Sequence, residues 1–120
     1  MKDQNGSEIV HVVESKKFGF IGYLVIDRLI GGTSFGGVRI TPDISLPELQ
    51  LIAKNMTYKN AFVGNRIGGG KAAVVIDQDN EKHRKEILTE FGKRISPFVR
   101  KRMFSPGKDM EQNVKNIKVC

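Results

Sequence analysis

Apolar and polar residues in the first third of the chain follow a pattern typical of strands. Residues 9–14 and 18–29 are rich in Val, Ile, Phe and Tyr, and both segments are predicted to be strands. The polar Ser15-Lys16-Lys17 between them predicts a hairpin turn. Residues 35–40 predict a third strand or the end of one, and Thr41-Pro42-Asp43 terminates it.

A helical pattern then begins at Ser45, because Glu48 three residues later completes a capping box. Pro47 falls in the first turn, where its missing N–H does no harm. Gly64 is expected to end this helix. One face of the helix, with spacings of four and three residues, is formed by Leu49, Ala53, Met56, Asn60 and Val63.

The second half of the chain predicts one buried strand and two helices. Residues 72–76 are almost continuously apolar, as in a strand covered on both faces. Asp79 or Asn80 can cap the next helix, and Ser96-Pro97 is expected to break or kink it. Apolar stripes are expected on this helix at Ile87, Leu88, Phe91 and Ile95, and on a short closing helix at Met110, Val114 and Ile117. The order of elements predicts a layered α/β/α domain with a mixed sheet of about four strands.

Length and composition favour a single domain over residues 1–120, with residues 1–7 as a short flexible tail rather than a secretory signal. No apolar stretch approaches the about 20 residues needed to span a bilayer. A single cysteine, Cys120, excludes an internal disulfide and fits a reducing cytoplasm. One cysteine and two separated histidines give no metal-binding cluster.

The chain carries a formal charge of +7, and much of the excess lies between residues 81 and 102, where eight Lys or Arg face three Glu. A nucleic-acid surface is one interpretation of this segment. A solvated helix face is the favoured one, because charges of both signs recur at helical neighbour spacings, Glu81 with Lys85 and Glu90 with Lys93 or Arg94. The basic residues also lack the interleaved aromatics of single-strand binders, so nucleic acid is an unlikely partner.

Two lysines carry the candidate chemistry. Lys59 falls late in the first helix, and Lys71 follows Gly68-Gly69-Gly70 and opens the buried strand. Lysines that converge on a glycine-lined turn predict a site for a small anion, with a neighbouring amine whose pKa is lowered by burial and by a second cation. The plain alternative for either residue is a solvated surface lysine.

Four segments together resemble a known family: Gly36-Gly37-Val38-Arg39, Ser45-Leu46-Pro47-Glu48, residues 56–61 and residues 68–71. They are similar to the N-terminal substrate-binding and oligomerisation domain of the glutamate/leucine/phenylalanine/valine dehydrogenases, over residues 8–109. The resemblance implies that Lys59 binds the substrate α-carboxylate and that Lys71 is the catalytic amine. It also implies that Asp109 completes the catalytic group.

For Asp109 a second interpretation stays open. An Asp before an apolar helical pattern is most often a helix N-cap. The family's aspartate is followed by Val-Gly-Thr, whereas here the next residues are Met110-Glu111-Gln112.

The resemblance also implies the substrate pocket, in which Gly36, Gly37, Gly69 and Gly70 are expected to contact the substrate. Phe35 stands just before the first glycine pair, where glutamate-specific members carry a lysine. An apolar residue there implies an apolar amino acid or 2-oxo acid as ligand. A core aromatic is the compatible alternative for Phe35, and Arg39 is expected to be structural.

The activity implied for a complete enzyme is the reversible oxidative deamination of an L-amino acid. A dinucleotide-binding fingerprint requires a strand, then glycines that open a helix. In this chain a helix precedes the glycines and a strand follows them. We therefore expect no cofactor in this chain, with NAD or NADP held by a separate nucleotide-binding domain. The chain is expected to form a homo-oligomer, either as part of such an enzyme or as a non-enzymatic amino-acid or oxo-acid binding and regulatory module.

Overall fold

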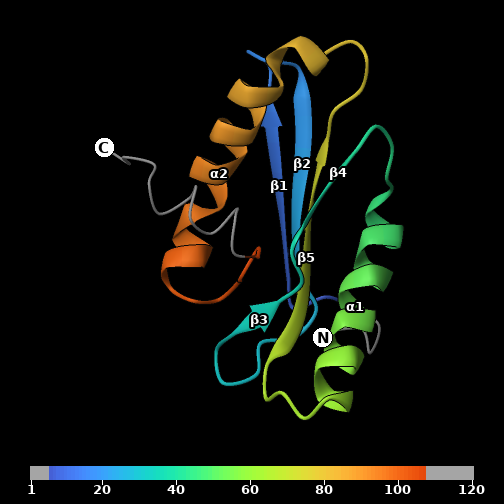
Figure 1. Cartoon of the computed structure of the whole chain (residues 1–120), viewed down its shortest axis with the longest axis vertical. Helices are drawn as coiled ribbons and strands as arrows, with labels where there is room; N and C mark the ends of the chain where they lie inside the picture. The colour runs from blue at the N-terminus through green and yellow to red at the C-terminus, as the bar shows by residue number, and fades with distance from the viewer. Residues whose placement is uncertain (1–5, 108–120) are drawn as a thin grey trace.

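One mixed sheet separates two helices that lie on its opposite faces (Figure 1). The computed structural model describes residues 6–107. The strands are β1 (Ile9–Ser15), β2 (Phe20–Ile26), β3 (Ser34–Phe35), β4 (Val38–Thr41) and β5 (Gly68–Val75). The helices are α1 (Leu46–Phe62), the short 3-10 helix η1 (Glu81–His83) and α2 (Arg84–Arg100). The layered α/β prediction is confirmed. The sheet has five strands because Gly36 and Gly37, the latter with φ of 79°, divide the expected third strand into β3 and β4.

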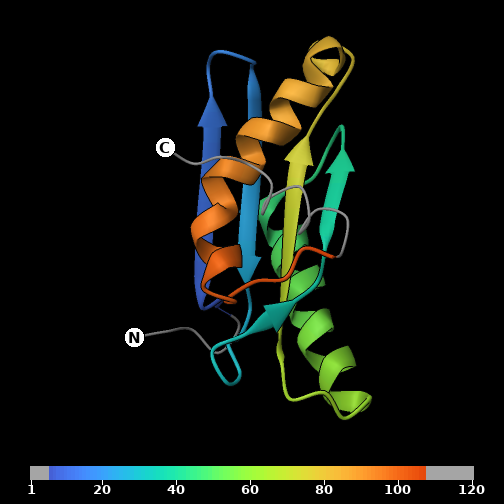
Figure 2. The ribbon, with the colours of Figure 1, turned by 60° about the vertical axis from the view of Figure 1, so that its left-hand side comes forward.

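Strand β5 is central to the sheet. It pairs antiparallel with β2 and parallel with both β3 and β4, while β1 pairs with β2 and, within residues 6–107, is an edge strand. Figure 2 shows α2 in front of this sheet and α1 behind it. Alternate β5 residues therefore contribute to two cores: Ala72 and Val74 pack on the α2 side, and Ala73 packs on the α1 side.

The glycines before Lys71 belong to β5, which begins at Gly68 rather than at residue 72 as predicted. Neighbouring backbones occupy the space that side chains would need. A Cβ on Gly68 would collide with the Arg28 carbonyl oxygen, and a Cβ on Gly36 would collide with that of Gly70. The expected glycine-lined turn is therefore a closely packed strand, and its glycines are needed for packing.

The ends of α1 are as predicted. The Ser45 hydroxyl accepts a hydrogen bond of 3.3 Å from the Glu48 N–H, and Gly64 adopts φ of 81° just beyond the helix. On the predicted inner face, Leu49, Ala53 and Asn60 are buried and Met56 is partly buried. Val63 was wrongly assigned to that face and is 68% exposed, because the helix ends before it.

Helix α2 continues through Pro97 to Arg100, so Ser96-Pro97 does not break it, and of the predicted break or kink the break is wrong. Proline cannot donate to the carbonyl four residues earlier, which belongs to Lys93. The Ser96 hydroxyl donates to that carbonyl instead, at 2.9 Å. A side chain thus replaces the missing backbone donor, and the helix continues. The predicted stripe is otherwise present, with Ile87, Phe91 and Ile95 buried and Leu88 partly buried.

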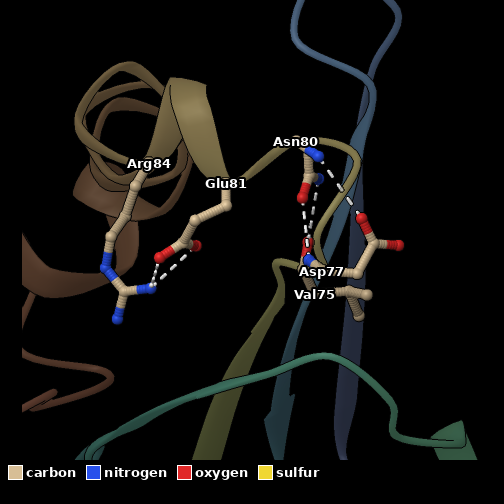
Figure 3. Close-up of polar contacts among 5 residues, drawn as sticks. All are labelled: Val75, Asp77, Asn80, Glu81 and Arg84. Atoms are coloured by element: carbon tan, nitrogen blue, oxygen red, sulfur yellow. Dashed lines mark hydrogen bonds and ion pairs between the residues drawn. The ribbon is translucent and has the colours of Figure 1, made fainter.

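Asn80 does not cap the second helix with its side chain, contrary to one expectation (Figure 3). Its Oδ1 accepts from the Asp77 N–H at 2.8 Å, and its Nδ2 donates to the carbonyls of Gly19 and Val75 at 3.1 and 3.4 Å. Asn80 therefore ties the turn after β5 to the β1–β2 hairpin, a contact between residues 61 positions apart that local sequence cannot indicate.

The basic segment forms an exposed helix surface on which Arg and Glu side chains make ion pairs. Arg84 pairs with Glu81 at 3.1 Å (Figure 3), and Arg94 pairs with Glu90 at 3.8 Å. The expected Glu81 and Lys85 pair is thus replaced by a pair three residues apart. Among residues 6–107, neither long helix has the length and apolarity required to cross a bilayer. Within the same range no three His, Cys, Asp or Glu side chains are grouped so that they could hold a metal ion.

Two predictions concern residues outside the described range. Asp109 and the expected closing helix with Met110, Val114 and Ile117 both lie beyond residue 107. At the other end, Gly6 and Ser7 are described. The Gly6 carbonyl accepts a hydrogen bond from Arg28, and the Ser7 hydroxyl accepts one from Gln50.

Candidate functional site

Lys71 is a half-buried amine on the α1 side of β5. It pairs in register with Val25, which belongs to the core under α1. Its Nζ donates a hydrogen bond of 2.8 Å to the Gly36 carbonyl, at the bend between β3 and β4. Burial lowers the pKa of Lys71 below its ordinary value, and the positive charges of Arg39 and Lys59 lower it further.

Arg39 and Lys59 reach this site from two other elements. Arg39 pairs with Ala73 across β4 and β5, so it shares the sheet face of Lys71. Lys59 lies in the last turn of α1, and both of these side chains are exposed. Two cations beside one half-buried amine suit a small anion, because a bound carboxylate supplies the missing negative charge.

Arg39 has a larger part in this site than its expected structural role. Its positive charge acts on Lys71 more strongly than that of Lys59 does. The sequence signal was the motif Gly36-Gly37-Val38-Arg39, but only the parallel pairing of β4 with β5 puts Arg39 on the same face as Lys71.

The site glycines act mainly by letting elements approach one another. The N–H groups of Gly36 and Gly37 point at the Ser105 carbonyl, at 3.4 and 3.5 Å, and the Gly69 N–H points at the Thr57 hydroxyl. These backbone donors are therefore engaged within the protein. Gly70 lies on the opposite sheet face from Lys71, where a Cβ would sit 3.0 Å from the Ser34 hydroxyl.

Phe35 is 38% exposed on β3, so it is not a core aromatic. It pairs with Gly69 in the sheet and directly precedes Gly36, whose carbonyl accepts the hydrogen bond from Lys71. The Phe35 ring thus lies one residue from the Gly36 carbonyl that accepts the hydrogen bond from the Lys71 amine. Arg66, two residues before β5, is exposed.

A buried polar network behind the site was missed by the sequence analysis. Asp27 is only 5% exposed, and its carboxylate accepts a hydrogen bond of 2.7 Å from the Thr57 hydroxyl. That hydroxyl accepts from the Gly69 N–H at 2.9 Å, and Asn60 Nδ2 donates to the Gly68 carbonyl at 3.0 Å. The sequence signal was an Asp at the end of an apolar strand, a residue type that is rarely buried without a partner.

The chain is thus a three-layer α/β domain in which Lys59, Arg39 and Lys71 lie beside the glycines of β5. Residues 9–120 match the family model described as Glu/Leu/Phe/Val dehydrogenase, dimerisation domain. The match covers most of the chain, and the chain therefore belongs to this family.

Relatives and solved structures agree with this assignment. The chain is 29% identical over 98 residues to a valine dehydrogenase from Streptomyces virginiae, and this match covers 78% of the chain and 27% of the relative. It is 28% identical over 86 residues to a leucine dehydrogenase from Bacillus subtilis, covering 68% of the chain and 23% of that relative. The chain thus spans about a quarter of the length of these curated relatives.

The crystal structure of L-tryptophan dehydrogenase from Nostoc punctiforme has the same fold. It superposes with a TM-score of 0.73 at 23% identity, over 93% of this chain and 35% of that one.

Proposed function

We propose that this chain is the substrate-binding and oligomerisation domain of an NAD(P)-dependent L-amino-acid dehydrogenase acting on apolar substrates. The observation that carries this proposal is the half-buried Lys71 amine, which has a lowered pKa and lies near Arg39 and Lys59. Membership of the dehydrogenase family supplies the chemistry for such an amine.

Each residue has a definite role in the proposed reaction. Lys59 binds the α-carboxylate as a point charge at the mouth of the site. Lys71, with its pKa lowered toward the working pH, removes a proton from the water that attacks the imino carbon. Asp109 moves the proton on the amino group. The chemistry that NAD or NADP supplies is hydride acceptance, in a complete enzyme with a separate nucleotide-binding domain.

The proposed substrate class rests on Phe35. An exposed aromatic ring beside the bend that holds Lys71 offers contact to an apolar side chain and no charge to a second carboxylate. We therefore expect binding of apolar amino acids and 2-oxo acids in preference to glutamate and 2-oxoglutarate.

The proposed homo-oligomer, a dimer or higher, is supported by the exposed edge of the sheet. β1 is an edge strand, and its Val10 and Val12 are 40% and 45% exposed on the α1 side. An edge strand with apolar residues tends to pair with another chain unless it is covered. A second copy that pairs there would bury these valines.

Calorimetric titration with the 2-oxo acid of leucine, 4-methyl-2-oxopentanoate, tests the function. The protein should bind this compound, and Lys71→Met, which keeps the length and apolar stem of the side chain, should abolish binding without unfolding the domain. Lys93→Met, on the exposed face of α2, is the matched control and should bind as the native chain does. Equal binding by all three proteins would refute the proposed site.

A further inference from the structure

One peptide unit of β5, the one between Gly68 and Gly69, has both of its polar groups bonded to side chains of α1. The Gly68 carbonyl accepts from Asn60 Nδ2 at 3.0 Å, and the Gly69 N–H donates to Thr57 Oγ1 at 2.9 Å. Thr57 and Asn60 are three residues apart and therefore share one face of the helix. Two side chains on consecutive turns thus clamp a single peptide plane.

The direction of these hydrogen bonds is determined by Asp27. The Thr57 hydroxyl donates its only proton to the Asp27 carboxylate at 2.7 Å, so it meets the Gly69 N–H as an acceptor. Asp27 is buried at the end of β2, and its own N–H donates to the Gly69 carbonyl at 2.8 Å. The clamp therefore ties α1 to both β2 and β5.

Close packing at Gly69 leaves no space for α1 to move relative to β5. A Cβ on Gly69 would collide with the Thr57 backbone nitrogen and would lie 2.5 Å from the Ala53 carbonyl oxygen. The backbones of α1 and β5 are thus in direct contact at Gly69. Any sliding or lifting of the helix would break the clamp and open a gap in a buried region.

The clamp residues are close to both lysines along the chain. Lys59 stands between Thr57 and Asn60 in the last two turns of α1, and Lys71 is two residues after Gly69 on the same face of β5. The placement of one amine relative to the other therefore depends on these hydrogen bonds together with the close packing at Gly69. We propose that Thr57 and Asn60 are positioning residues that hold Lys59 and Lys71 at the separation needed to bind one carboxylate. This inference rests on the proposed function and adds the parts that position its site.

A purely structural clamp and a positioning clamp predict different results. A structural role implies that losing the Thr57 hydroxyl lowers the free energy of unfolding. The molecules that stay folded would then have Lys59 and Lys71 in unchanged positions. A positioning role implies that the folded molecules themselves have a looser pair of amines. The titration of the Lys71 amine reports on the second effect, because its pKa depends on burial and on the nearness of Lys59 and Arg39.

The decisive variant is Thr57→Val, which keeps the β-branched shape and removes the hydroxyl. Thr57→Ser restores the hydroxyl, and Thr89→Val makes the same change on the exposed face of α2. Lysine side-chain NMR, with the Lys71 signal assigned by its loss in Lys71→Met, should show the Lys71 pKa rising toward its ordinary value in Thr57→Val. Calorimetry with 4-methyl-2-oxopentanoate should show at least tenfold weaker binding by that variant.

Thr57→Ser and Thr89→Val should titrate and bind within about twofold of the native chain. A folded Thr57→Val with native Lys71 titration would overturn the inference. If the native chain fails to bind the oxo acid, the proposed function fails, and the Lys71 titration alone still decides the role of the clamp.

Asn60→Leu removes the other hydrogen bond at similar volume. If Thr57→Val does not fold, Asn60→Leu should show the same rise of the Lys71 pKa and the same weaker binding.

Amide hydrogen exchange in the unaltered protein gives a third measurement. By linkage, a carboxylate that needs the clamp must also strengthen it, so saturating oxo acid should slow exchange at the Gly69 N–H more than at Val74. Equal slowing at both amides would contradict a positioning role.

Discussion

The substitution Gly69→Ala provides a direct test of how closely α1 approaches β5. The new methyl group would lie 2.5 Å from the Ala53 carbonyl oxygen and 2.6 Å from the Thr57 hydroxyl, whereas ordinary contact begins at 3.4 Å. The helix must therefore retreat by more than roughly 0.9 Å, the difference between 2.5 and 3.4 Å, because the Thr57 backbone nitrogen is closer still. Because the Ala53 oxygen is backbone, no rotation of a flexible side chain can relieve this clash.

The cost follows from two terms. Overpacking of a closed site costs about 1–3 kcal/mol. Loss of the hydrogen bond from Gly69 to Thr57 adds about 1 kcal/mol. Together they lower the free energy of unfolding by about 2–4 kcal/mol, a large part of the about 5–15 kcal/mol typical of a domain.

Urea denaturation followed by circular dichroism, at one fixed protein concentration, measures this loss. Gly64→Asn is the control, because Gly64 has φ of 81° in open space and Asn tolerates that conformation. It should lose under about 1 kcal/mol. A Gly69→Ala protein as stable as this control would refute the close approach of α1 to β5.

Four further predictions follow from the site and the sheet edge. Because the pKa of Lys71 lies below 10.5 in the folded chain, the unfolded chain binds more protons between the two values, so the free energy of unfolding should rise with pH through that window. Urea titrations at several pH values should show this rise in the native chain and in Lys93→Met but not in Lys71→Met. Phe35→Lys should shift binding from 4-methyl-2-oxopentanoate toward 2-oxoglutarate in calorimetry, and an unchanged preference would contradict the role of the ring. Val12→Lys should weaken self-association in sedimentation while Thr89→Lys does not, and a native chain that stays at 13.4 kDa would exclude the oligomer. Finally, calorimetry should detect no micromolar binding of NAD or NADP to these 120 residues alone.

Several features of this protein were predictable because they depend on neighbours in the sequence. Ser45 caps α1 through an N–H three residues away, and Gly64 supplies the left-handed turn that ends the helix. The two lysines were identifiable for the same reason, since each stands in a short motif of distinctive residue types.

Local pattern misled where a side chain made a hydrogen bond other than the one that the pattern implies. The helix-breaking signal of Pro97 was overruled by the hydroxyl of its neighbour Ser96, and the capping signal of Asn80 by the carbonyls of Gly19, in the β1–β2 turn, and Val75, on β5. The three glycines looked like a loop because nothing in the chain shows that backbones from α1, β3 and the end of β2 approach them.

The sequence by itself determined the two long helices, the main strands, most of the apolar faces and the two candidate amines, because periodicity and capping act within a few residues along the chain. Only the tertiary structure decided that Arg39 shares the face of Lys71 and that Thr57 and Asn60 clamp a peptide unit of β5. Strand pairing and close packing join residues far apart in sequence, and these contacts determine the electrostatic surroundings of Lys71.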